Sequence, residues 1–171
     1  MYIPIILGTA RIGRQSEKVA NFVLQQLEIK KIDTEIIDVR DYQLSATDGS
    51  GESELAKIFA SKINKSSAII IVTPEYNHGY PGELKLMLDL LYEEYFGKPI
   101  GFCAVSKSSM GGVRAVEQLR LVSIELHMIP IRDAVYFSNI EKLFDSQSQI
   151  TDSSYVNRVS KFIDSLNSCI K

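Results

Sequence analysis

The chain has 171 residues, 45% of them hydrophobic and 23% charged, which suits one domain with one buried core. Its formal charge of −2, without long runs of one sign, excludes the charge pattern of a nucleic-acid-binding or anionic-membrane-binding protein. Two cysteines, Cys103 and Cys169, make neither a disulfide framework nor a metal site, so we expect two thiols in a reducing cytoplasm. The first residues lack the features of a signal peptide, and we expect no membrane span.

Apolar spacing predicts five strands that alternate with five helices. Runs rich in β-branched residues predict strands at 3–7, 34–39, 67–73, 99–106 and 129–135. Apolar residues at helical spacing predict helices that begin near residues 15, 55, 84, 113 and 155. Asp48, Gly49 and Gly51 are turn signals in the polar stretch 41–54. The alternation predicts a single α/β domain over residues 1–171: a doubly wound sheet of five parallel strands in the order 2-1-3-4-5, with helices on both faces.

The segment 84–91 is apolar nearly all round, interrupted only by Lys85 and Asp89. Such a helix either lies deep inside the monomer or has its second face covered by another subunit. We favour the second arrangement because Tyr92, Tyr95 and Phe96 extend the apolar surface. The sequence therefore predicts a homodimer or homotetramer.

In this topology the loops 8–14, 73–82 and 106–112 converge on one crevice at the carboxyl ends of the strands. The first offers the hydroxyls of Thr9 and Ser16, the guanidinium of Arg11 and free amides at a helix start, which are the parts of a phosphate site. GxGxxG and Walker patterns are absent, so a terminal phosphate fits better than a pyrophosphate. The alternative is that Ser16 only caps the helix while Arg11 and Arg14 are solvated. A low-molecular-weight tyrosine phosphatase is excluded because it needs a cysteine within this loop.

The second loop suits the edge of a flat heterocycle. Pro74 holds the backbone open, Tyr76 and Tyr80 could flank a ring, and Asn77 can both donate and accept hydrogen bonds. We interpret His78 as a structural residue, and likewise Glu75. The third loop supplies small residues, among them Gly111 and Gly112, where the backbone must come close to something flat.

At these residues the sequence resembles the NAD(P)H-dependent FMN reductase family, flavodoxin-like proteins that include quinone, azo-dye and chromate reductases. The matching stretches are 8–11 with Ser16, 74–85 with Asp89, and 111–115 with 118–120, although the third loop lacks the extra glycines expected of the family. The resemblance implies non-covalent FMN, with NADPH or NADH as hydride donor. It places the phosphate on Thr9, Arg11 and Ser16, and the ring edge on the backbone of 74–77 with the third loop nearby. The expected cofactor-binding residues are Thr9, Arg11, Ile12, Gly13, Arg14, Gln15, Ser16, Pro74, Glu75, Tyr76, Asn77, Ser106, Lys107, Gly111 and Gly112.

The corresponding activity is ping-pong hydride transfer from NAD(P)H through FMN to a small acceptor such as a flavin, quinone or azo compound. It requires no side-chain acid or base and no metal, because the cofactor carries the chemistry. The rival hypothesis is a flavodoxin-type electron carrier, which the near-neutral charge disfavours. A flavin-free interaction domain is a third reading. Since segment 72–91 would hold both the ring edge and the subunit interface, we expect dilution to monomers to loosen FMN.

Overall fold

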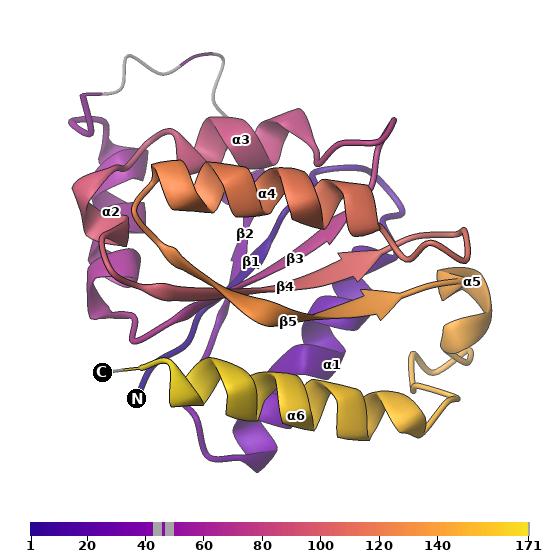
Figure 1. Ribbon diagram of the computed structural model, residues 1–171. Helices are drawn as coiled ribbons and strands as arrows, with labels where there is room; N and C mark the ends of the chain where they lie inside the picture. The colour runs from indigo at the N-terminus through magenta and orange to yellow at the C-terminus, as the bar shows by residue number, and fades with distance from the viewer. Residues whose placement is uncertain (43–45, 47–49, 171) are drawn as a thin grey trace.

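The computed structural model describes residues 1–42, 46 and 50–170, so the turn predicted at Asp48 and Gly49 lies outside the described residues (Figure 1). Five parallel strands form one sheet: β1 (Ile5–Leu7), β2 (Ile36–Asp38), β3 (Ile69–Pro74), β4 (Pro99–Val105) and β5 (Ile129–Phe137). Their order is β2-β1-β3-β4-β5, which confirms the predicted topology. As the apolar run at 67–73 suggested, β3 is the central strand and is buried over nearly its whole length.

Helices cover both faces of the sheet (Figure 1). The helices α1 (Ser16–Ile29) and α6 (Ser154–Ser168) lie on one face, and α2 (Glu54–Lys65), α3 (Gly82–Leu88) and α4 (Val113–Glu125) lie on the other. Alternate residues of β3 feed the two cores: Ile70 and Val72 pack toward α1 and α6, whereas Ile69 and Ile71 pack toward the other three helices. In the described part of the chain, no helix combines the length and apolarity needed to cross a membrane.

The apolar segment 84–91 belongs to the core of the monomer. The helix α3 ends at Leu88, and Leu84, Met87, Leu88, Leu90 and Leu91 are each at most 5% exposed. The short 3-10 helix η2 (Glu93–Tyr95) folds back over this segment, and the hydroxyl of its fully buried Tyr95 donates to the carbonyl oxygen of Leu88 at 3.1 Å. The burial of these five residues agrees with the alternative that the segment lies deep inside the monomer, contrary to the arrangement favoured from the sequence.

Two short elements escaped prediction besides η2. The 3-10 helix η1 (Val39–Tyr42) follows β2, and the four-residue helix α5 (Ile140–Leu143) follows β5. The amides of Asn139 and Ile140 donate to the carbonyl oxygens of Ser108 and Ser106, at 3.2 and 3.1 Å. These bonds bring a fourth chain segment to the carboxyl edge of the sheet, beside the three loops expected there.

Candidate functional site

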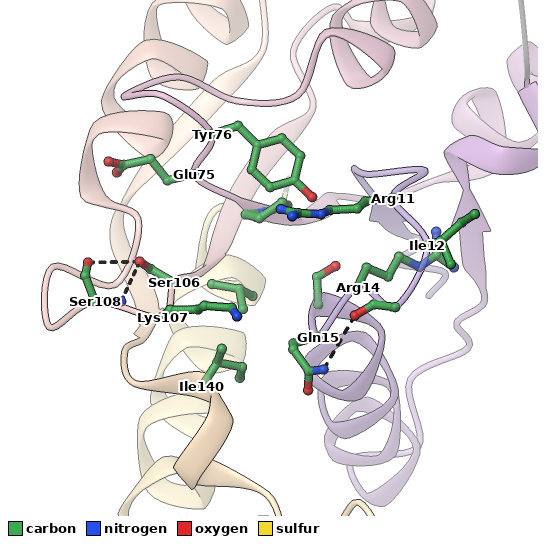
Figure 2. Close-up of a pocket in the computed structure, with 14 residues that line it drawn as sticks. Arg11, Ile12, Arg14, Gln15, Glu75, Tyr76, Ser106, Lys107, Ser108 and Ile140 are labelled. Carbon is green, nitrogen blue, oxygen red and sulfur yellow. Dashed lines mark hydrogen bonds between the residues drawn. The ribbon is translucent and has the colours of Figure 1, made fainter.

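A cavity of about 440 Å³ lies where the predicted loops meet, at the carboxyl ends of the strands (Figure 2). Its walls are residues 11–16 of the first loop, 74–76 of the second, 105–108 of the third, and Ile140. Every residue predicted to bind the cofactor lines this cavity except Thr9, Asn77, Gly111 and Gly112. The volume falls in the range of small-molecule sites.

The start of α1 has the properties of an anion site. Ser16 is only 2% exposed, and its Oγ has no hydrogen-bond partner among the described residues. The amides of Ile12, Gly13 and Gln15 likewise find no acceptor there. Ser16 does not cap the helix, because the cap position belongs to Gln15 and carries no side-chain bond. A buried hydroxyl and free amides at a helix N-terminus are suited to a phosphate group.

Arg14 holds this loop in shape from behind. Its Nη1 donates to the carbonyl oxygen of Thr9 at 2.6 Å and to Oδ1 of Asp38 at 2.7 Å, and its Nη2 pairs with the other oxygen of Asp38. The hydrogen bond with Asp38 raises the pKa of Arg14 above its ordinary value, against the effect of burial. The guanidinium of Arg14 is thus neither solvated nor available to a ligand, and only the rest of the residue borders the cavity.

Arg40 completes this support. Its Nε donates to the carbonyl oxygen of Ala10 at 3.2 Å, and its Nη2 donates to that of Arg11 at 2.7 Å. With the bond from Arg14 to Thr9, the carbonyl oxygens of three successive residues, 9–11, each accept a hydrogen bond from an arginine. The amides that follow are left without protein acceptors, so the loop is prepared to receive negative charge.

Arg11 is the cation that remains for a ligand. Its guanidinium lies over the ring of Tyr76, 5.4 Å from the ring centroid, and makes no ion pair within the described residues. Figure 2 shows the side chain extending across the cavity beneath Tyr76. Thr9, by contrast, is fully buried, and its hydroxyl lies 3.0 Å from that of Tyr76 and 3.2 Å from Glu83. Thr9 therefore supports the loop from inside the protein, and its hydroxyl is engaged by protein groups.

The second loop is fixed by its neighbours. The side chain of Glu75 is 10% exposed and accepts from the guanidinium and the amide of Arg114, at 2.6 and 3.1 Å. Gln118 donates to the carbonyl oxygen of His78 at 2.9 Å. All three bonds come from residues of α4, so the interpretation of Glu75 as a structural carboxylate agrees with the geometry. Tyr80 is half-buried against the core beneath α3 and α4 and does not line the cavity, contrary to the expectation that it flanks a ring.

The backbone of this loop offers fewer donors than expected. The amide of Tyr76 donates to Gly79 at 2.8 Å, and that of Glu75 donates to Val105 at 3.3 Å. Of the residues 74–77, only Asn77 keeps a free amide among the described residues, since Pro74 has none. Asn77 borders an adjoining open hollow of about 480 Å³ that also involves Arg11, Glu75 and Tyr76.

The glycines of the third loop serve the fold. Gly111 and Gly112 have φ angles of +64° and +89°, a region that side chains disfavour. A Cβ at Gly111 would lie 2.7 Å from Cβ of Tyr136, and one at Gly112 would lie 3.0 Å from Cβ of Ala104. What the backbone approaches closely at these glycines is therefore the sheet itself. The prediction of a close approach is thus met by the sheet, on the side where a Cβ would stand.

The cavity wall of the third loop comes from the residues before these glycines. The hydroxyls of Ser106 and Ser108 lie 2.9 Å apart, and the amide of Ser108 donates to Oγ of Ser106 at 3.0 Å. Nζ of Lys107 pairs with Glu141 at 2.5 Å on the rim. The amide of Lys107 has no acceptor among the described residues and can donate to a ligand.

Comparison with known proteins identifies the family. Residues 1–142 match the family model described as NADPH-dependent FMN reductase. The chain belongs to this family. An NAD(P)H-dependent FMN reductase of Schizosaccharomyces pombe is 35% identical over 136 residues, covering 74% of this chain and 67% of the relative. A quinone reductase of Pseudomonas putida is 29% identical over 159 residues, covering 88% and 84%.

A solved structure shares the architecture. The flavoenzyme NAD(P)H:(acceptor) oxidoreductase FerB of Paracoccus denitrificans has a TM-score of 0.83 at 18% identity, over 99% of this chain and 96% of that chain. The fold and family expected from the sequence are confirmed.

Several residues at this cavity were not singled out from the sequence. Val105, Ser108 and Ile140 also line the cavity. Asp38, the last residue of β2, and Arg40, in η1, support the first loop through their hydrogen bonds. Because the carboxyl end of β2 also faces this edge, the topology could have pointed to them.

Proposed function

We propose that the protein binds FMN non-covalently in this cavity and uses it to reduce a small acceptor with NADPH or NADH. The observation that carries this proposal is the unpartnered, buried hydroxyl of Ser16 among free amides at the start of α1. That arrangement fits a terminal phosphate. The cavity beside it extends to Tyr76 and Ser106 and suits a flat ring system in volume. Family membership supplies the same cofactor independently.

In this proposal different loops bind different parts of the cofactor. The amides of 12–16, Oγ of Ser16 and the guanidinium of Arg11 would hold the phosphate, and the second and third loops would hold the ring. Bound FMN would take a hydride from NAD(P)H and pass the electrons to the acceptor. The free amides of Asn77 and Lys107 are among the donors in these loops that could face negative charge on a ligand.

No side chain at the cavity is arranged as a general acid or base. The carboxylate of Glu75 is occupied by Arg114, and the ammonium of Lys107 is paired with Glu141. The protein thus acts by binding and orienting. The open hollow beside Tyr76 has Arg11, Glu75 and Tyr76 in common with the cavity wall. We propose that the hydride donor and the acceptor occupy this hollow one after the other, which corresponds to a ping-pong order. Parallel lines in double-reciprocal plots are expected, and intersecting lines would contradict that order.

The experiment that tests the function is a titration of the purified protein with FMN, followed by visible absorbance, and then addition of NADH or NADPH. We expect a bound-flavin spectrum that bleaches with the nucleotide and recovers with a quinone or free flavin. The names of the S. pombe and P. putida relatives suggest these two acceptors. A colourless protein that gains no bound-flavin spectrum would overturn the proposal. Bound flavin without turnover unless a partner protein is present would favour the electron carrier.

We also propose that the protein is a homo-oligomer whose interface lies at an aromatic patch formed by Tyr92, Phe96, Ile124 and His127. Tyr92 and Phe96 are each 47% exposed, and the ring of Phe96 lies 4.5 Å from that of His127. Exposed aromatic clusters of this kind are enriched at subunit contacts, and a two-fold axis would pair the patch with its own copy. The free thiols Cys103 and Cys169 fit the proposed cytoplasmic location, which cell fractionation would test.

A further inference from the structure

The hydroxyl of Thr9 joins three segments behind the cavity. Its Oγ1 lies 3.2 Å from Oε1 of Glu83, at the start of α3, and 3.0 Å from the hydroxyl of Tyr76. It also accepts from the amide of Arg11 at 3.3 Å. The same oxygen of Glu83 accepts from the amide of Ala10 at 2.9 Å. The first loop and the ring of Tyr76 are therefore both tied to one carboxylate.

The direction of these hydrogen bonds follows from chemistry. A carboxylate has no proton to give, so Thr9 donates its single hydroxyl hydrogen to Glu83. The hydroxyl of Tyr76 must then donate to Thr9, whose second lone pair takes the amide of Arg11. The hydroxyl of this buried threonine is fully used. The hydrogen of the Tyr76 hydroxyl is directed away from the cavity, and its oxygen is left as an acceptor.

We propose that Glu83 is a positioning residue, which sets this hydrogen-bond order and holds the first loop and Tyr76 in their binding geometry before a ligand arrives. The inference rests on the proposed FMN function. Glu83 acts through Thr9 and Ala10 and does not line the cavity itself. This positioning role of Glu83 also explains why Thr9 is buried although it belongs to the loop that is proposed to bind the phosphate. Binding to a site fixed in advance loses less entropy.

Electrostatic and positioning effects of Glu83 predict opposite changes in FMN affinity, so the two can be told apart. A carboxylate bonded to the phosphate loop repels a phosphate dianion, so removal of the negative charge alone would tighten FMN binding. If Glu83 acts by positioning, its removal must instead weaken binding. Glutamine separates the two effects, because its carbonyl oxygen can accept from Thr9 and Ala10 without the charge.

The first experiment measures FMN dissociation constants of the apo-protein by quenching of flavin fluorescence. We expect Glu83→Ala and Thr9→Val to weaken binding by about tenfold, and Glu83→Gln and Thr9→Ser to stay within about threefold of the wild type or bind more tightly. The double variant of Glu83→Ala and Thr9→Val should lose less than the product of the single losses, because both break one network. Equal or tighter binding by Glu83→Ala would overturn the proposal.

The second experiment needs no flavin. Hydrogen–deuterium exchange of the peptide covering residues 9–16 in the apo-protein should be faster in Glu83→Ala and Thr9→Val than in the wild type, and restored in the conservative variants. Thermal unfolding confirms that each variant is folded. If the wild type fails to bind FMN, the proposed function fails, while the exchange data still decide the role of Glu83. Unchanged exchange in both disruptive variants would contradict it.

Discussion

Arg114 donates to Glu75 twice, from its guanidinium at 2.6 Å and from its backbone amide at 3.1 Å. The contact ties the second loop of the cavity to the first turn of α4. Since the side chain of Glu75 is nearly buried, the carboxylate depends on these two donors. The pair anchors the loop that carries Tyr76 to the helix behind it.

Replacing Arg114 by alanine should therefore loosen the second loop. Because the guanidinium is partly exposed and the amide bond remains, we expect a loss of about 1 kcal/mol in the free energy of unfolding. FMN binding should weaken by about fivefold, since Tyr76 follows Glu75 directly. Urea unfolding and flavin titration measure the two effects. Lys161→Ala, an exposed change on α6, is the control, and equal flavin affinity in both variants would contradict the anchoring role.

Ser16→Ala should separate binding from stability. The hydroxyl is buried and has no partner in the described part of the chain, so its removal should leave the apo-protein as stable as the wild type or slightly more stable. FMN should bind about tenfold more weakly, because the phosphate loses one donor. Differential scanning fluorimetry and flavin titration give the two readouts.

The matched control for Ser16 is Ser123→Ala. Its hydroxyl is equally buried but donates to the carbonyl oxygen of Leu119 at 2.8 Å, far from the cavity. That variant should lose stability and keep its flavin affinity. If Ser16→Ala also keeps its flavin affinity, the phosphate does not lie at this hydroxyl.

The elements that the sequence predicts well depend on local pattern. The apolar run of β3 and the helical spacing of α1, α2, α4 and α6 mark their own positions, and the parallel topology then brings the loops together. The burial of Leu90 and Leu91 was not predictable in this way, because it depends on packing in a core built from elements distant in the sequence. The spacing of apolar residues gives the period of a helix but not what covers each face.

The same limit applies within the site. Thr9 and Arg14 have the side chains of a phosphate site, and the sequence alone suggested that they touch the ligand. The structure gives each a protein partner, Glu83 for Thr9 and Asp38 for Arg14. Asp38 lies 24 residues from Arg14 in the sequence, at the end of β2. Residue types in a loop indicate the chemistry available there, whereas partners across the sheet decide which groups remain free.

The stability of the first loop should depend on pH through Asp38. Burial alone would raise the pKa of Asp38, but bonds from Arg14 and the amide of Arg40 outweigh it, and the pKa lies below the ordinary 3.8. A depressed folded-state pKa contributes stability that is present above the unfolded-state value and is lost as pH falls through the folded-state value. Asp38→Asn should be less stable by about 2 kcal/mol at pH 7.

The difference between wild type and Asp38→Asn should stay constant down to about pH 5 and shrink below about pH 4, as the wild-type carboxylate is protonated. Urea unfolding at several pH values tests this. Asp164→Asn serves as control, because Asp164 is largely exposed and pairs with Lys30 at the surface. That variant should differ little from the wild type at any pH. A difference for Asp38→Asn that persists unchanged at pH 3 would show that charge pairing is not its source.

The aromatic patch leads to a prediction about assembly. Phe96→Ser should turn the proposed oligomer into a monomer at the same concentration, as measured by analytical ultracentrifugation, because it removes an exposed ring at the centre of the patch. Val156→Ser, which changes an exposed apolar residue on α6, should leave the mass unchanged. A wild-type protein that sediments as a monomer would refute the interface.

The position of the aromatic patch also changes the expected effect of oligomerisation on FMN binding. Phe96 and His127 precede β4 and β5, so they lie at the amino ends of these strands, whereas the cavity lies at the carboxyl ends. The sequence led us to expect that dilution to monomers loosens FMN, because segment 84–91 was assigned to the interface. With that segment inside the core, monomeric Phe96→Ser should bind FMN as tightly as the wild type in the titration. Weaker binding by this variant would mean that subunits meet at the cavity as well.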